Sequence, residues 1–184
     1  QIKKARPKKC IVIYNTPRID ESSINQKIIK SSNNKFKIVY VGILQDNRLL
    51  KEIGEEIKKY PDFELHIGGF GQLQNYFLGL SQKYNNIFYY GQMKYEDVLK
   101  LEEDANFLFA TYNPEITNHK YSAPNKLYEA MALGKPIIVC KNTGIDKLVN
   151  NENIGLSILY SEKEFMESVE KLYNNKNSQK QLSY

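Results

Sequence analysis

Short apolar runs alternate with amphipathic segments along this chain from Phe36 onward. Several of the runs are nearly all apolar, which is typical of strands covered on both faces. We expect six strands, at residues 37–42, 64–67, 86–90, 106–110, 136–140 and 156–159. Between them, apolar residues recur three and four positions apart, which predicts helices. The expected helices cover residues 50–60, 73–80, 95–101, 127–133, 145–149 and 165–173, with Asp46 as a cap of the first.

This alternation is typical of repeated βα units. It predicts an α/β fold, a Rossmann-like doubly wound parallel sheet of about six strands. Such sheets bind ligands in the crevice beyond the carboxyl ends of their strands. The loops expected at that end are residues 42–48, 68–71, 91–94 and 111–123. The glycines at 68–71 fit either a phosphate-cradling loop or a tight turn.

The organisation that we expect has one packed domain with two flanking segments. A chain of 184 residues is long enough for a single well-buried core. An apolar run at 10–14 followed by a polar stretch at 21–34 predicts a strand and connector over residues 1–36. Residues 37–175 then form the α/β domain, and residues 176–184 form a tail.

Composition narrows the class of protein. The chain is 41% hydrophobic and 26% charged, which excludes collagen-like, mucin-like and wholly disordered classes. The net charge of +5 comes from scattered lysines without interleaved aromatics, so we expect no nucleic-acid partner. Cys10 and Cys140 lie in apolar runs and are expected to be reduced core residues of a cytoplasmic protein. No run approaches the ~20 apolar residues of a spanning helix or resembles a signal peptide, so any membrane contact is expected to be peripheral.

The segment YSAPNKLYEAMALGKP, residues 121–136, carries the clearest chemistry. Pro124 near its start and Gly134 near its end predict a helix. On that helix an apolar face is separated from a polar face. The expected core face has Leu127, Ala130 and Met131, and the expected polar face has Asn125, Lys126 and Glu129.

The start of this helix is suited to an anionic ligand. Its first N–H groups, the positive end of the helix dipole and Lys126 together predict a diphosphate site. Glu129 lies about 6 Å further along the axis. A carboxylate at that offset can accept hydrogen bonds from both hydroxyls of a ribose diol.

The run SAPNKLYEAMALGKPIIV resembles the end of the E-x7-E signature of the retaining glycosyltransferases of family 4. The resemblance is to their C-terminal, donor-binding domain, one half of the two-domain GT-B architecture, and covers roughly residues 10–173. Weaker similarity is carried by IVIYNTPRID, IVYVGIL, LHIGGFG and FYYGQMKYEDVLKL.

The resemblance implies which residues hold a nucleoside-diphosphate-sugar donor. Glu129 is expected to bind the ribose, and Arg48 and the stretch 122–126 the diphosphate. The base is expected against the loop after the third strand. Gly42 and Gly69, at the ends of two strands, are also expected at the donor site. The full set is Tyr121, Ser122, Ala123, Asn125, Lys126, Glu129, Arg48, Gly42, Gly69, Gln92, Met93 and Lys94. No metal or other cofactor is expected.

The implied function is transfer of a sugar, with retention of configuration, to a glycan or lipid-linked acceptor in bacterial surface polysaccharide synthesis, such as capsule or lipopolysaccharide. The acceptor is expected on an N-terminal domain, so these residues alone are expected to be inactive. Tyr121 stands where the family has the first Glu of its signature, and Ile43 where it has an Arg. Two alternatives therefore stay open, a nucleotide-sugar epimerase of the same architecture and a non-catalytic nucleotide-binding or scaffold module.

Overall fold

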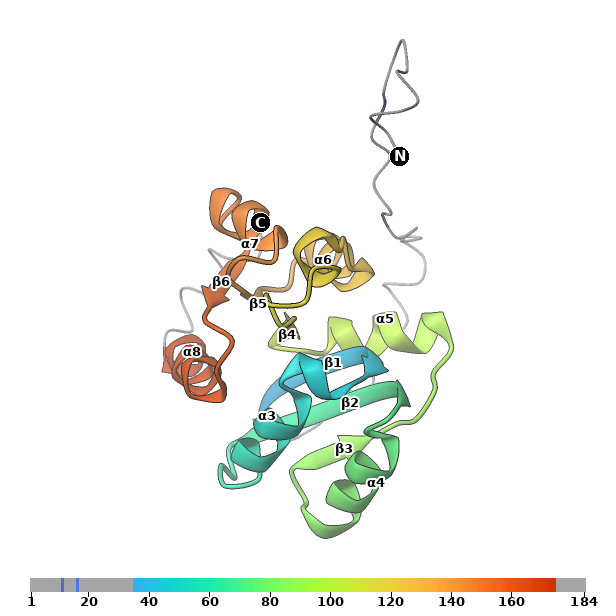
Figure 1. Ribbon diagram of the computed structural model, residues 1–184. Helices are drawn as coiled ribbons and strands as arrows, with labels where there is room; N and C mark the ends of the chain where they lie inside the picture. Colours follow the sequence, from blue (N-terminus) through green and yellow to red (C-terminus); the bar gives the residue numbers. More distant parts are fainter. Residues whose placement is uncertain (1–10, 12–15, 17–34, 175–184) are drawn as a thin grey trace.

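The computed structural model describes residues 11, 16 and 35–174, and a single parallel sheet runs through the last of these ranges (Figure 1). Its strands are β1 (Phe36–Leu44), β2 (Phe63–Gly71), β3 (Ile87–Tyr89), β4 (Phe107–Ala110), β5 (Ile137–Cys140) and β6 (Gly155–Ile158). The helices are α3 (Leu50–Ile57), α4 (Gln74–Lys83), α5 (Tyr95–Glu103), α6 (Asn125–Ala132), α7 (Ile145–Asn151) and α8 (Glu162–Asn174), with short 3-10 turns η1 (Asp46–Arg48) and η2 (His119–Tyr121). The expected strand at 10–14, the tail at 176–184 and most of the connector lie outside the described residues.

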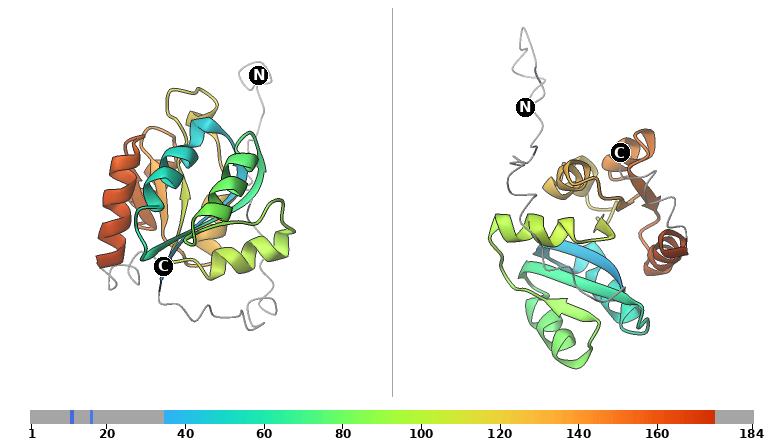
Figure 2. Two further views of the ribbon diagram at one scale, coloured as in Figure 1. Left: turned by 90° about the horizontal axis from the view of Figure 1, so that it is seen from below. Right: turned by 180° about the vertical axis from the view of Figure 1, so that it is seen from behind.

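The strands are ordered β3-β2-β1-β4-β5-β6, all parallel, and helices cover both faces (Figures 1 and 2). On β1, Ile38 and Tyr40 belong to the core beneath α3, α4 and α8. Val39 between them belongs to the second core, beneath α5, α6 and α7. This alternation follows from the two-residue period of a strand. The predicted doubly wound sheet of six strands is confirmed.

The first two strands continue further than their apolar pattern indicates. They pair from Phe36 and Phe63 through to Leu44 and Gly71, so residues 42–44 and 68–71, expected as loops, are strand. Gly69 makes this possible. Its φ is +119°, and a Cβ there would stand 1.8 Å from the carbonyl oxygen of Gly42. At this point the two backbones approach too closely for any side chain on residue 69, and the glycines that allow this resemble a loop in the sequence.

Two expectations about helices were wrong. Asp46 does not cap α3, because that helix begins after Leu49, whose φ is +56° and which forms no side-chain cap. Met131 is 43% exposed instead of buried with Leu127 and Ala130. Of the expected polar face, Lys126 and Glu129 are buried on the side of α6 where α5 packs, and Asn125 is exposed.

The pairing between β1 and β4 is short. It holds only Ile38 with Phe107 and Val39 with Leu108, whereas β1 and β2 pair along their whole lengths. The two central strands therefore separate toward their carboxyl ends. Within the part of the chain that the structure describes, no helix has the length and apolar character needed to cross a membrane.

Candidate functional site

The connections after β1 and β4 meet at the point where the strand order reverses. From β1 the chain moves outward to β2 and β3, and it then returns to β4 on the other side. Sheets with such a switch point bind ligands in the crevice above it. Here Thr111 Oγ1 donates to the carbonyl oxygen of Arg48 at 2.6 Å, and Asn113 N donates to that of Asn47 at 3.3 Å. These bonds join the two connections into one rim.

The helix α6 begins at this rim. Pro124 is extended, with φ −70° and ψ 138°, and no side chain caps the helix that starts at Asn125. Ser122 does not act as a cap, because its hydroxyl donates to the carbonyl oxygen of His119 at 3.0 Å. The positive end of the helix dipole therefore lies at this rim, and the N-cap residue Pro124 offers no side-chain acceptor to it.

Lys126 points into the sheet rather than to solvent. Its ammonium donates to the carbonyl oxygen of Val41, lies 3.4 Å from Glu102 Oε1 and stands 4.7 Å from the ring centroid of Tyr40. The residue is 5% exposed. Its charge thus sits at the floor of the crevice, between the separating ends of β1 and β4.

Glu129, one turn further along α6, is also buried at 5% exposed. Tyr95 and Glu102, both on α5, lie within reach of its charge. Burial raises the pKa of Tyr95 to about 12, and the charge of Glu129 adds to that shift. Tyr95 itself is 47% exposed at the start of α5.

Arg48 lies at the end of η1 against aromatic rings. Its guanidinium carbon is 4.5 Å from the ring centroid of Tyr112, and Nε donates to Gln45 Oε1 at 3.4 Å. Burial raises the pKa of Tyr40 well above its usual value, while the Arg48 charge opposes that effect. The Tyr40 hydroxyl donates to the carbonyl oxygen of Ile43 at 2.9 Å, which fixes the end of β1 beneath Arg48.

The loop expected to hold a base is anchored through β2. Gly69 N donates to the carbonyl oxygen of Gly91 at 2.6 Å, and Tyr89 Oη donates to that of Gly69 at 3.0 Å. Of the loop residues, Gln92 and Lys94 are exposed and Met93 is half-buried. A Cβ on Gly69 would meet the backbone of Gly42, so the structure gives this glycine a packing role.

A model of the family described as "Glycosyl transferases group 1" matches residues 21–184. The chain belongs to this family. No curated protein sequence matches it significantly. Solved structures do match, and because their sequence identities are low, the match establishes the fold alone.

One matching structure is WaaG, a glycosyltransferase involved in lipopolysaccharide biosynthesis, with 16% identity, a TM-score of 0.66 and coverage of 84% of this chain and 42% of that one. HepE of Anabaena, in complex with UDP and glucose, has 17% identity, a TM-score of 0.64 and coverage of 82% and 42%. The C-terminal domain of the group 1 family protein LpcC from Francisella tularensis has 15% identity, a TM-score of 0.63 and coverage of 80% of each chain. The chain thus spans less than half the length of WaaG and HepE, and its fold is that of the C-terminal domain of GT-B glycosyltransferases.

In this group 1 family member the crevice gathers most of the predicted residues. Gly42, Arg48 and the stretch 121–126 surround the switch point, with Glu129 buried beside it. Tyr121, at the position of the family's first Glu, is 83% exposed. Which of these groups contact a donor stays a prediction.

Sequence reasoning missed Glu102 and Tyr95. Both lie on α5, where they are three and four positions either side of the buried Val98. Side chains at that spacing share one face of a helix, so the signal was present. It was overlooked because a glutamate is seldom placed on a core face unless it is paired.

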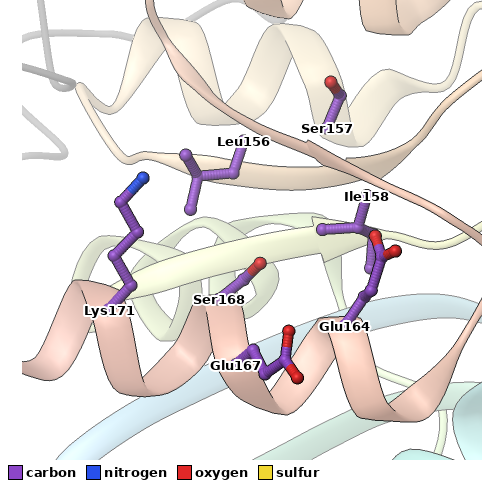
Figure 3. A pocket seen from close by; sticks show the side chains of 7 residues that line it. All are labelled: Leu156, Ser157, Ile158, Glu164, Glu167, Ser168 and Lys171. Atoms are coloured by element: carbon purple, nitrogen blue, oxygen red, sulfur yellow. The ribbon is translucent and has the colours of Figure 1, made fainter.

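The structure also has a hollow far from the switch point, and it is not part of the candidate donor site. A hollow of about 260 Å³ lies between the edge strand β6 and α8, bordered by Glu164, Glu167 and Lys171 (Figure 3). It is two strands from the switch point. Among the described residues no group of His, Cys, Asp and Glu is arranged to hold a metal ion.

Proposed function

We propose that this domain binds the nucleoside-diphosphate-sugar donor of a glycosyltransferase. The observation that carries the proposal is the geometry of α6, whose uncapped start opens on the switch point while its Lys126 charge lies at the crevice floor and Glu129 follows one turn later. These are the parts that a diphosphate followed by a ribose needs. The HepE structure, of the same fold, contains UDP.

In the proposed reaction the bond between the sugar's anomeric carbon and the diphosphate oxygen breaks, and a bond to the acceptor hydroxyl oxygen forms. The diphosphate leaves with the bonding electron pair, and its departing oxygen takes up the proton that the acceptor hydroxyl loses. The α6 dipole, Lys126 and Arg48 stabilise the negative charge that develops on it. Because the chain's own cationic groups supply this stabilisation, the proposal requires no metal. By the family resemblance, the configuration at the anomeric carbon is retained.

The acceptor side of the proposal draws on the lengths of the matching proteins. Since WaaG and HepE are more than twice as long as the matched part, we place the acceptor and the remaining donor contacts on another domain. The domain alone is then expected to bind donor without turning it over. A role in bacterial surface polysaccharide synthesis is supported by the likeness to WaaG. We place the enzyme in the cytoplasm, in agreement with the free, buried thiol of Cys140, with any membrane contact peripheral.

The test is calorimetric titration of UDP, GDP and ADP, and of their common sugars, into the chain and into Glu129→Gln. The glutamine keeps the volume of the buried side chain but cannot carry its charge. We expect one diphosphate to bind and the substitution to weaken it ~10- to 100-fold, the loss of a charged hydrogen bond of ~1.5–3 kcal/mol. Glu152→Gln, on an exposed residue at the end of α7, is the matched control and should bind as the wild type does.

Two other outcomes would point to the alternatives. If no diphosphate binds, the donor-site assignment fails for this chain and a scaffold role is favoured, with the exposed Tyr121 and Ile43 at the crevice as its first candidate contacts. If a nucleotide sugar binds, the products made by the longest available form of the protein, with and without acceptor, decide between transfer and epimerisation.

A further inference from the structure

The gap between β1 and β4 leaves a backbone acceptor that Lys126 satisfies. Asn106 N donates to the carbonyl oxygen of Lys37, so the carbonyls of alternate residues from Lys37 on face β4. That of Val41 does so beyond the last paired residue, Val39. No strand reaches it, and the Lys126 ammonium donates to it instead. A buried carbonyl without such a donor would be costly.

The Lys126 ammonium, bound to the Val41 carbonyl oxygen, also contacts the side chain of Glu102. It is 0% exposed, and its Oε1 lies 3.4 Å from Lys126 Nζ. Its Oε2 is buried without a hydrogen-bond partner among the described residues. A buried carboxylate with one unpartnered oxygen is strongly disfavoured, whereas a neutral carboxylic acid is tolerated more easily.

The two charges nearest to Glu102 act in opposite directions on its pKa, and burial decides the outcome. The groups that face it are Lys126 and Glu129 on α6 and, through Glu129, Tyr95 on its own helix. Burial raises the pKa of Glu102 to about 7; Lys126 opposes the rise and Glu129 adds to it. With its pKa at about 7, Glu102 keeps its proton below neutral pH and loses it above.

We propose that Glu102 is a positioning residue of the donor site, which as a neutral acid holds the Lys126 ammonium in the gap between β1 and β4 without cancelling its charge. When Glu102 ionises, it neutralises that charge and weakens the binding of a diphosphate. This inference rests on the proposed donor site and adds a residue to it. The neutral acid accepts through its Oε1, so Lys126 keeps its place while its full charge faces the crevice.

The sign of the effect follows from linkage. An anion bound above Lys126 favours the neutral form of Glu102, so donor binding takes up a proton wherever Glu102 is ionised in the empty site. Affinity should therefore fall as the pH rises through neutrality. Glu102→Gln is neutral at every pH and nearly the same shape, so its affinity should lack this component.

The experiment is titration of UDP, and of GDP and ADP if UDP does not bind, at about pH 6 and about pH 8.5. The ratio of the wild-type dissociation constant to that of Glu102→Gln cancels the titration of the nucleotide itself. We expect the ratio to be near one at the lower pH and at least ~5 at the higher, with the substituted chain binding more tightly. Glu103→Gln, the next residue of α5, makes the same change of charge outside the cluster and should follow the wild type at both values.

A ratio that does not change with pH overturns the role of Glu102 while leaving the donor site intact. Absence of any diphosphate binding by the wild type at both values overturns the proposed function instead. A measurement without nucleotide keeps the two apart. The carboxyl carbon resonance of Glu102, identified by its loss in Glu102→Gln, should titrate near neutral pH in the free chain. A midpoint near the ordinary glutamate value of 4.5 would refute the inference whatever binds.

Discussion

The close approach of β1 and β2 makes a sharp prediction about Gly69. In Gly69→Ala the new Cβ would stand 1.8 Å from the carbonyl oxygen of Gly42, and the φ of +119° is one that alanine rarely adopts. Backbone strain of this kind amounts to ~1–3 kcal/mol. Forcing an extra methyl into a packed site adds ~1–3 kcal/mol. We therefore expect the free energy of unfolding to fall by at least ~3 kcal/mol, a large part of the stability of a domain of this size.

The assay is urea unfolding followed by circular dichroism, with Gly79→Ala as the matched control. Gly79 lies in α4, and a Cβ there meets nothing within 4 Å. The same change is expected to stabilise the chain by ~0.5–1 kcal/mol at that site, because glycine is a poor helix former. Equal stabilities for the two variants would refute the reading of β1 and β2 as strands joined by a glycine contact.

Two further predictions concern the buried cluster. The stability that Glu102 contributes is fully present below about pH 4.5 and is lost as the pH rises through about 7. Across that window the free energy of unfolding of Glu102→Gln, measured by heat or urea, should gain up to ~3 kcal/mol on that of the wild type. A difference that stays constant with pH, as expected for Glu103→Gln, would contradict this. Tyr95→Phe removes a hydroxyl on which the charge of Glu129 acts, and we expect this to leave Glu129 more open to a ribose, so that diphosphate affinity rises ~2- to 10-fold in calorimetry, the worth of one hydrogen bond. Weaker binding would instead show that the Tyr95 hydroxyl contacts the ligand.

The strands and helices were predictable because most of them have strong local signals. Short apolar runs such as the one around Phe107 favour buried strands, and Pro124 indicated the start of α6 to within a residue. The extension of β1 and β2 was not predictable in this way. It depends on contact between Gly42 and Gly69, which are distant in sequence and have no side chain to form a pattern.

The candidate site was predictable in position but not in its contacts. The strand order and the helix start at Asn125 place it at the switch point. The polar residues of α6 look outward on a helical wheel, since the wheel carries no information about a second helix packed over them. Only the tertiary structure brings Glu102 to Lys126 and Tyr95 to Glu129. Pairings of this kind are set by packing between elements rather than by sequence spacing.

The short pairing between β1 and β4 also bears on how the domain opens. The sheet consists of two three-stranded halves, joined backbone to backbone at Ile38–Phe107 and Val39–Leu108 and by the bond from Asn106 N to the carbonyl oxygen of Lys37. Regions with few shared hydrogen bonds are where native proteins open below the level of global unfolding. Amide hydrogen exchange is therefore expected to divide the domain into two cooperative units along this seam, with Lys126 as the cross-link at its open end. A bound ligand spanning the seam should slow exchange in both units together.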